Sequence, residues 1–308
     1  MTPDITTVFG GTGFLGSRIV REIVASGRPV RIAARHPVRP AWAGAGDAIE
    51  LATANIHDET SVARALDGAT AAVNAVSLYA EAGGHDTFEA VHVTGAGRMA
   101  RLAREAGVRR LVHISGIGAD VTSPSFYVRA RARGEQSVRA AFPNAVIVRP
   151  SVLFGPQDAF LANLARLAQL PVIPLFGRGD TRLQPVFVDD VAQAVARLTA
   201  AADPAASLFE LGGARVYRYR EIVEQVLDHC GRRRRLLMPV PFLLWRTLAG
   251  LTMFLPNPPL TRDQVLLMQK DNVVHPGTAT FADLGIAPHS LEESLPHCLK
   301  PGQGRDTP

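Results

Sequence analysis

The chain has 308 residues and a formal net charge of +5, and its 47% hydrophobic and 20% charged residues are ordinary for a globular protein. Arginine supplies nearly all of the positive charge and no aromatic-interleaved basic patch occurs, which argues against a nucleic-acid-binding protein. The two distant cysteines, Cys230 and Cys298, indicate a reducing compartment and no metal site, and without a signal peptide or a run of about 20 apolar residues we expect a cytoplasmic protein.

The first predicted element is a strand over Thr6–Phe9 that runs directly into glycines with the spacing G-x-x-G-x-x-G. Apolar residues at three- and four-residue steps then predict a helix over Phe14–Ala25. Glycines allow a tight turn and a close approach of phosphate oxygens, and the helix N-terminus offers N–H groups to a pyrophosphate. Strand, glycine turn and helix in this order predict a dinucleotide site. Its predicted cofactor contacts are Gly10, Thr12, Gly13, Phe14, Leu15 and Gly16.

The alternation of strand and helix continues to about Arg149. The further predicted strands are Val30–Ala34, Ile49–Ala52, Ala71–Ala75, Leu111–Ser115 and Val146–Arg149. The further predicted helices are Glu59–Leu66, Phe88–Ala106 and Tyr127–Ala141. Short apolar strands separated by helices predict an α/β fold with a doubly wound parallel sheet, the Rossmann architecture.

The regular alternation ends after Pro150. We therefore expect a dinucleotide-binding core over 1–150 and a mixed region over 151–300. Part of that region, about 183–201, is expected to return to the core with a helix from Asp189 to about Ala201. The remainder, chiefly beyond Gly212, is expected to form a smaller, mostly helical C-terminal lobe for a substrate or partner, and 301–308 to be a polar tail.

The ends of the second, third and fourth strands predict the rest of the cofactor site. A carboxylate at the end of the second strand usually selects NAD, whereas this chain has Arg35 there, which attracts a 2′-phosphate. We therefore favour NADP(H) and keep NAD(H) as the alternative; a solvated surface arginine is the other interpretation. Asn55 is predicted to contact adenine, and Ala75 and Val76 to line the cofactor channel, unless they serve only in strand-end packing.

Three residues predict chemistry near the nicotinamide. Ser115 ends the fifth strand, at the edge where such sheets bind ligands, and Tyr127 and Arg131 share one helix face at i and i+4. A neighbouring cation can lower the pKa of a tyrosine and make it a general acid or base, while a serine can hold a carbonyl oxygen. A structural tyrosine, a solvated arginine and a strand-end serine are the alternative interpretation.

These motifs together resemble the short-chain dehydrogenase/reductase superfamily, in its extended or atypical, epimerase/dehydratase-like branch. Further stretches resemble the bacterial relatives of the NADPH-binding accessory subunit of mitochondrial respiratory complex I, over nearly the whole chain. They are His113–Ala119, Ser123–Tyr127, Gly134-Glu135, Val148–Ser151 with Phe154-Gly155, Gln184–Val191, Leu260–Gln264 and Asp271–Val273. The resemblance implies an NADP(H)-binding core with a small C-terminal lobe, and adds Pro150 and the pair Tyr127 and Arg131 as cofactor contacts.

The superfamily motif is Tyr-x-x-x-Lys, and Arg131 stands in place of the lysine. An arginine supplies charge and hydroxyl contacts but cannot lose a proton, so a lysine-type proton relay is absent. The resemblance therefore implies a complex I accessory-type protein that binds cofactor with little or no turnover. The alternatives are an active NADP(H)-dependent oxidoreductase and a nicotinamide-dependent epimerase or dehydratase, acting on a carbonyl or sugar-like substrate.

The segment 232–255 begins with four arginines and continues with apolar residues that include Trp245. It predicts either a core helix that closes the substrate cleft or an interfacial helix at a membrane surface or a respiratory-complex partner. The second interpretation adds a peripheral position at the inner face of the membrane to the cytoplasmic assignment.

Overall fold

The computed structural model of the protein describes residues 4–81, 83–251 and 260–299. The chain divides into two compact units. The first contains the chain through Pro150 together with Val188–Leu211 and Pro276–Ile286, and the second contains Ser151–Phe187, Gly212–His275 and the chain from Ala287 onward. The predicted tail 301–308, and residues 252–255 of the predicted partner segment, lie outside the described residues.

A seven-stranded parallel sheet forms the centre of the first unit, with the order β11-β6-β5-β4-β1-β2-β3. The strands are β1 (Ile5–Phe9), β2 (Val30–Ala34), β3 (Ile49–Thr53), β4 (Ala69–Asn74), β5 (Arg110–Ile114), β6 (Val146–Pro150) and β11 (Leu208–Leu211). This order confirms the predicted doubly wound α/β fold. The sequence predicted six of these strands, and β11 is the strand that it did not predict.

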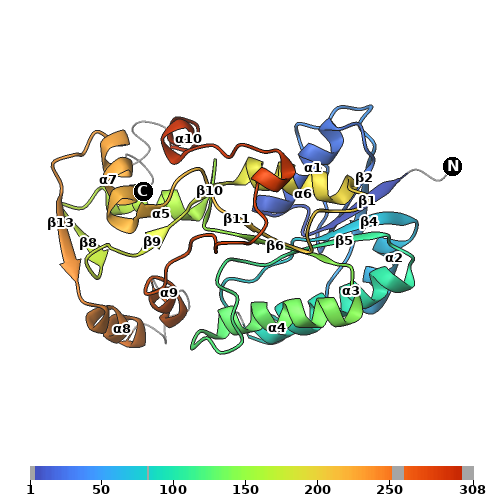
Figure 1. Ribbon diagram of the computed structural model, residues 1–308, viewed down its shortest axis with the longest axis horizontal. Helices are drawn as coiled ribbons and strands as arrows, with labels where there is room; N and C mark the ends of the chain where they lie inside the picture. Colours follow the sequence, from blue (N-terminus) through green and yellow to red (C-terminus); the bar gives the residue numbers. More distant parts are fainter. Residues whose placement is uncertain (1–3, 82, 252–259, 300–308) are drawn as a thin grey trace. The chain divides into compact units, whose positions relative to one another are not determined.

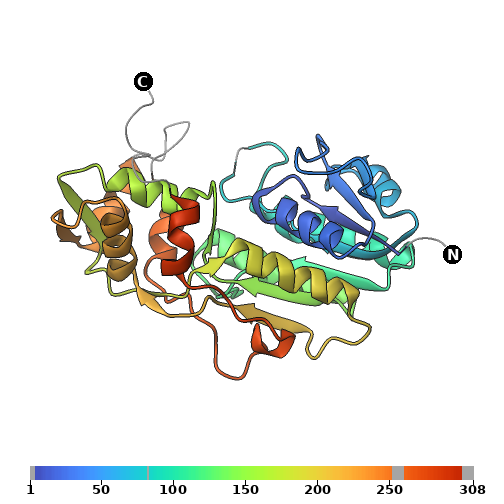
Figure 2. The same ribbon diagram turned by 90° about the horizontal axis from the view of Figure 1, so that it is seen from above.

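Helices cover both faces of this sheet (Figures 1 and 2). On one face lie α1 (Phe14–Ala25) and α6 (Val188–Ala200), and on the other lie α2 (Glu59–Leu66), α3 (Ala96–Glu105) and α4 (Phe126–Ala141). The apolar periodicity explains α1, because its fully buried Ile19 and Ile23 recur on one face at a four-residue step. The helix predicted over Phe88–Ala106 begins as a π-helical turn, Glu89–Gly95, and continues as α3.

The second unit is a mixed lobe. Its helices are α5 (Ala159–Leu167), α7 (Tyr219–His229), α8 (Phe242–Leu251), α9 (Arg262–Leu267) and α10 (Leu291–Cys298). Its strands form three pairs: β7 (Leu153–Phe154) with β10 (Val186–Phe187), β8 (Val172–Phe176) with β13 (Leu236–Val240), and β9 (Arg182–Leu183) with β12 (Tyr217–Arg218). The sequence predicted helices for this lobe but not these short strands. Within the described residues, no helix is long and apolar enough to cross a membrane.

Parallel pairing brings the carboxyl ends of all seven strands to one edge of the first unit's sheet. The residues that follow β1, β2, β4 and β5 there are Gly10, Arg35, Ala75 and Ser115. Crevices outside this edge are where doubly wound sheets bind ligands. The fold therefore places the predicted cofactor and catalytic residues along one edge of a single unit.

Candidate functional site

The loop between β1 and α1 has the geometry of a phosphate cradle. Gly10 has φ of 75°, and a Cβ added to it would lie 2.8 Å from the carbonyl oxygen of Ala75. A Cβ added to Gly16 would lie 2.0 Å from the carbonyl oxygen of Gly10, so both positions require glycine. Gly13 caps α1 without a side-chain hydrogen bond, and no acidic residue occupies the first turn. The N–H groups and positive dipole of α1 thus suit a pyrophosphate.

The other predicted residues near this cradle differ in how exposed they are. The backbone of Ala75 and Val76 lies close to Gly10, and their place in a cofactor channel stays a prediction. Thr12 is exposed, whereas Phe14 is half-buried and Leu15 is buried in the core. Leu15 can therefore offer a ligand its backbone N–H but not its side chain.

The adenine end of the site contains a carboxylate that the sequence did not predict. Arg35 follows β2 and is exposed, and its Nη1 lies 3.6 Å from Oδ2 of Asp86. Nε2 of His57 lies 3.7 Å from Oδ1 of the same carboxylate. Asn55 is exposed, and its Oδ1 accepts a hydrogen bond of 3.1 Å from the N–H of His57. The predicted 2′-phosphate selector, Arg35, thus already has an intramolecular anion beside it.

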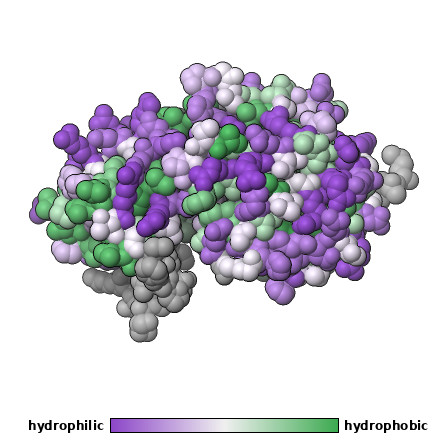
Figure 3. All heavy atoms as spheres, turned by 90° about the horizontal axis from the view of Figure 1, so that it is seen from below, coloured by the Kyte–Doolittle hydropathy of each residue, from purple (hydrophilic) through white to green (hydrophobic). Residues whose placement is uncertain are grey.

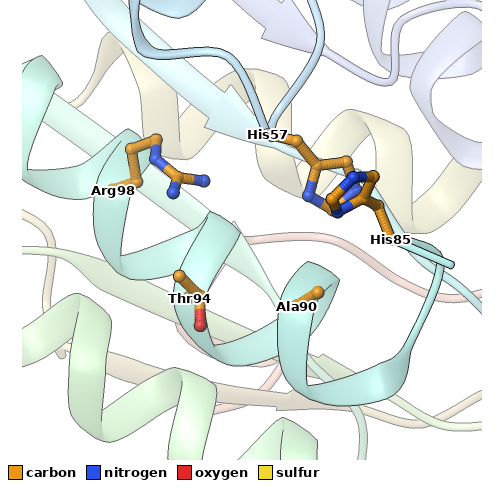
Figure 4. Close-up of a pocket in the computed structure, with 5 residues that line it drawn as sticks. All are labelled: His57, His85, Ala90, Thr94 and Arg98. Atoms are coloured by element: carbon orange, nitrogen blue, oxygen red, sulfur yellow. The ribbon is translucent and has the colours of Figure 1, made fainter.

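A cavity of about 380 Å³ lies beside this cluster. It is lined by His57, His85, Ala90, Thr94 and Arg98. Figure 4 shows the two imidazole rings close together, facing the helical segment that carries the other three residues; the ring centroids are 6.0 Å apart. Nη1 of Arg98 donates to the carbonyl oxygen of Ile56 at 2.9 Å, which fixes that arginine on the loop after β3. The adenine end is therefore rich in cationic and titratable groups.

Tyr127 and Arg131 meet as predicted, near the start of α4. Nε of Arg131 donates to the Tyr127 hydroxyl at 2.8 Å, and its Nη2 donates to Oγ of Ser77 at 2.9 Å. The sequence had pointed to the end of β4 only as far as Val76, so it missed Ser77, which lies one residue further along.

Arg131 is buried, with only 8% of its surface exposed, and its Nη1 has no hydrogen-bond partner within the described residues. A Cβ added to Gly116 would lie 3.7 Å from this atom and 3.9 Å from the carbonyl oxygen of Pro150. A buried donor without a partner costs about 1 to 3 kcal/mol. Because buried polar groups are rarely left unsatisfied, this N–H indicates a site for a ligand oxygen.

Burial controls the titration of the aromatic groups around Arg131. Burial raises the pKa of Tyr127 above its ordinary value, and the charge of Arg131 opposes that shift only in part. Burial also lowers the pKa of His92 to about 4 and that of His113 to about 3, with Arg131 adding to both shifts. At neutral pH Tyr127 is therefore protonated, both histidines are neutral, and Arg131 is the cation of this cluster.

Ser115 is buried at the end of β5, and its hydroxyl is turned to a different partner from the predicted one. Its Oγ donates to Oε1 of Glu135 at 2.5 Å. Glu135 in turn forms a two-point ion pair with Arg149, at 2.9 and 2.7 Å, and Arg149 contacts Glu210 at 3.3 Å. The hydroxyl proton that would hold a carbonyl oxygen is thus used within a buried ionic chain. A catalytic role for Ser115 stays a hypothesis.

Glu135 could have been anticipated from its spacing. It follows Tyr127 and Arg131 by eight and four residues, so all three lie along one side of α4. The sequence does not, however, show which side chain at the edge of the sheet Glu135 contacts.

Among the described residues, no group of three or more histidine, cysteine, aspartate or glutamate side chains could hold a metal ion.

Comparisons with known proteins show which family and which relatives the chain is similar to. Residues 6–212 match the NAD dependent epimerase/dehydratase family. The chain is 32% identical over 298 residues to a mouse (Mus musculus) mitochondrial protein, NADH dehydrogenase [ubiquinone] 1 alpha subcomplex subunit 9, covering 94% of this chain and 78% of that one. It is also 32% identical over 246 residues to a ceramide reductase of Caulobacter vibrioides, covering 78% and 75% of the two chains. These relatives confirm the resemblance predicted from the motifs.

Solved structures show the same fold. The crystal structure of an NADPH-dependent quinone oxidoreductase of Escherichia coli in complex with NADPH has a TM-score of 0.73, with 19% identity over 95% of this chain and 99% of that one. The structure described as gox2253 has a TM-score of 0.70, with 23% identity over 96% of both chains. At these identities the likeness concerns the fold alone.

Proposed function

The chain belongs to the NAD dependent epimerase/dehydratase family, a family of NAD(P)-binding proteins, and we propose that it binds NADP(H) with little or no turnover. The main support for this proposal is the difference between the hydrogen bonding of the Arg131 guanidinium and that of the Ser115 hydroxyl. The unpartnered Nη1 of Arg131 suits a bound cofactor, whereas the Ser115 hydroxyl, which turnover would need, donates to Glu135.

The described residues fit the cofactor along its whole length. The cradle at Gly10 and Gly16 and the N-terminus of α1 would hold the pyrophosphate, and Asn55 would face the adenine. Arg35 would bind a 2′-phosphate, which favours NADP(H) over NAD(H). Nη1 of Arg131 would donate to a nicotinamide ribose hydroxyl. A bound nicotinamide supplies hydride transfer.

The alternative function is an active oxidoreductase, or an epimerase or dehydratase that retains its nicotinamide. The contact of 2.8 Å between Arg131 and Tyr127 favours it, because a protonated tyrosine held beside a fixed cation can give a proton to a carbonyl oxygen. Against it, Arg131 cannot lose a proton and so cannot return one to Tyr127 as a lysine would. The relatives include both a mitochondrial NADH dehydrogenase subunit and a ceramide reductase.

We also propose a cytoplasmic location, peripheral at the inner face of the membrane. The segment 232–255 would there contact a respiratory-complex or membrane-surface partner. The support is the similarity to mitochondrial subunits of NADH dehydrogenase, together with the exposed apolar residues of α8.

The test is the nucleotide that copurifies with the full chain, identified by mass spectrometry and quantified by fluorescence of the reduced nicotinamide. We expect NADP(H) at close to one equivalent, and no consumption of NADPH with a panel of aldehydes and ketones. The variant Arg35→Gln should lose the preference for NADP(H), whereas Arg64→Gln, an exposed arginine on α2, should keep it. Turnover that Tyr127→Phe abolishes would establish the oxidoreductase instead, and a preference for NAD(H) would contradict the role of Arg35.

A further inference from the structure

Helix α8 has two apolar sides, and among the described residues of the second unit only one of them is packed. On the packed side, Ala249 is buried, the ring of Trp245 lies 4.7 Å from that of Phe176, and Nε1 of Trp245 donates to the carbonyl oxygen of Leu175 at 3.1 Å. On the other side, four leucines are exposed. They are Leu243, Leu244, Leu248 and Leu251, with exposed fractions of 72, 58, 43 and 74%.

Strand β13, which precedes α8 in the chain, carries two further exposed apolar residues. Leu236 and Met238 are 65% and 47% exposed, and their spacing of two places them on the same side of the strand. β13 ends at Val240, two residues before α8 begins, and Figure 1 shows it leading into that helix. We call the four leucines of α8 together with Leu236 and Met238 the apolar ridge. Figure 3 shows apolar residues gathered where α8 lies, at the left of that view.

The chain just before the ridge carries concentrated positive charge. Arg232, Arg233, Arg234 and Arg235 join α7 to β13, and with Asp228, Cys230 and Gly231 they line a cavity of about 580 Å³. Arg233 pairs with Asp228. In the part of the chain that the structure describes, the other three arginines pair with no carboxylate. We call these three residues the arginine loop.

We propose that the apolar ridge and the arginine loop form one docking surface for an anionic lipid bilayer. This inference rests on the proposed partner role of 232–255 and names that partner. A bilayer interface offers both complements side by side, since acyl chains accept leucine side chains and headgroup phosphates accept the planar fork of arginine. No described helix is long and apolar enough to cross the bilayer, so the contact would be with its surface.

The charge distribution favours a lipid over an apolar protein partner. Six apolar side chains could serve either partner, but the cavity at the start of β13 is lined by four arginines and one carboxylate, Asp228. That carboxylate pairs with Arg233, which leaves three arginines that pair with no carboxylate of the described residues. Each arginine near an anionic membrane surface strengthens binding about fivefold, and partitioned leucines add a contribution that salt does not screen. The docking surface should therefore require both anionic lipid and the leucines.

The experiment is flotation of the full chain with vesicles of phosphatidylcholine alone and of phosphatidylcholine with about one-third phosphatidylglycerol. We expect binding to the anionic vesicles only. The triple variant Arg232→Gln, Arg234→Gln, Arg235→Gln should lower the partition coefficient about 100-fold, from about fivefold for each arginine. The matched control Arg64→Gln, Arg104→Gln, Arg166→Gln removes the same charge from other exposed arginines, and should lower it less than about fivefold.

The leucines are tested by Leu244→Ser with Leu248→Ser. Both side chains are exposed, so the thermal unfolding midpoint should stay close to that of the wild type while vesicle binding falls at least tenfold. Absent binding to anionic vesicles, or equal binding by all variants, would overturn the proposal. So would a dimer in light scattering that the leucine variants dissociate, because the ridge would then be covered by a second copy.

Nucleotide occupancy, measured on the same samples, separates this inference from the proposed function. Retained NADP(H) without vesicle binding overturns the docking surface alone. Vesicle binding by a chain that takes up no nucleotide supports the docking surface and contradicts the proposed function.

Discussion

If NADP(H) binds as proposed, Asp86 would compete with its 2′-phosphate for Arg35, so the substitution Asp86→Asn should tighten the binding of NADPH and leave that of NADH nearly unchanged. The two charged groups are 3.6 Å apart, and their side chains are 67% and 37% exposed. An exposed pair of this kind is worth about 0.2 to 1 kcal/mol, which corresponds to about 1.5- to 5-fold in a dissociation constant. Removing a negative charge beside the arriving phosphate acts in the same direction, so we expect a gain near the upper end of this range.

The assay is titration with the reduced nucleotide, followed by its fluorescence, at low and at high salt. The gain for NADPH should shrink at high salt, because exposed charges are screened over a Debye length of about 10 Å at 0.1 M. Asp203→Asn, an exposed aspartate in the loop before β11, is the matched control and should change neither affinity. In an Arg35→Gln background, the gain from Asp86→Asn should largely disappear. Equal tightening of NADH and NADPH would refute the reasoning, because the carboxylate would then act on the whole nucleotide.

Three further predictions concern the cradle and the buried cluster. Arg131→Lys restores a cation that can pass on a proton, so NADPH consumption with added carbonyls should rise about tenfold or more, and an unchanged rate would show that Arg131 does not limit turnover. Gly16→Ala places a Cβ 2.0 Å from the carbonyl oxygen of Gly10, and should weaken NADPH binding at least tenfold and cost about 1 to 3 kcal/mol of stability in urea unfolding. The folded-state pKa values of His92 and His113 are lowered to about 4 and about 3, from the ordinary histidine value of 6.5. Below about pH 6.5 the unfolded chain therefore binds more protons than the folded chain. The free energy of unfolding should therefore fall from about pH 7 to about pH 5, by up to about 1.4 kcal/mol per pH unit for each histidine, and a flat profile would contradict this.

The sequence predicted the backbone of the β1–α1 segment well because that part of the fold is local. The β1 strand, the glycines and α1 follow one another directly, and their pattern of turn residues and apolar periodicity is written in about twenty residues. The predicted bounds of α1 and α2 match the observed ones, and those of the six predicted strands differ by at most two residues. The short strand β11 was missed because four residues after an irregular loop carry too little periodicity to predict a strand.

The side-chain partners could not be predicted in the same way. Asp86 lies 51 residues after Arg35, in a loop whose Gly83 and Gly84 both have positive φ, and only the folded chain brings the two charges together. The proximity of Tyr127 and Arg131 was predicted correctly because it depends only on helical spacing, whereas their roles stay a prediction. The partner of Ser115 depends instead on how α4 packs beside β5, which no local pattern specifies.

In this fold, cofactor binding and catalytic turnover depend on different kinds of chemical group. Cofactor binding can therefore be kept when turnover is lost. The pyrophosphate cradle is made of backbone N–H groups and of glycines that sterics alone enforce, so few side-chain changes can remove it. Turnover requires particular protons at particular atoms. Here the Ser115 proton is directed to Glu135, and the cation beside Tyr127 is one that cannot release a proton. Arg131 keeps the charge and the donors that a ribose needs while giving up the relay, and its unpartnered Nη1 is an N–H that a bound cofactor would satisfy. This composition supports the proposal that the site retains a nicotinamide nucleotide with little or no turnover.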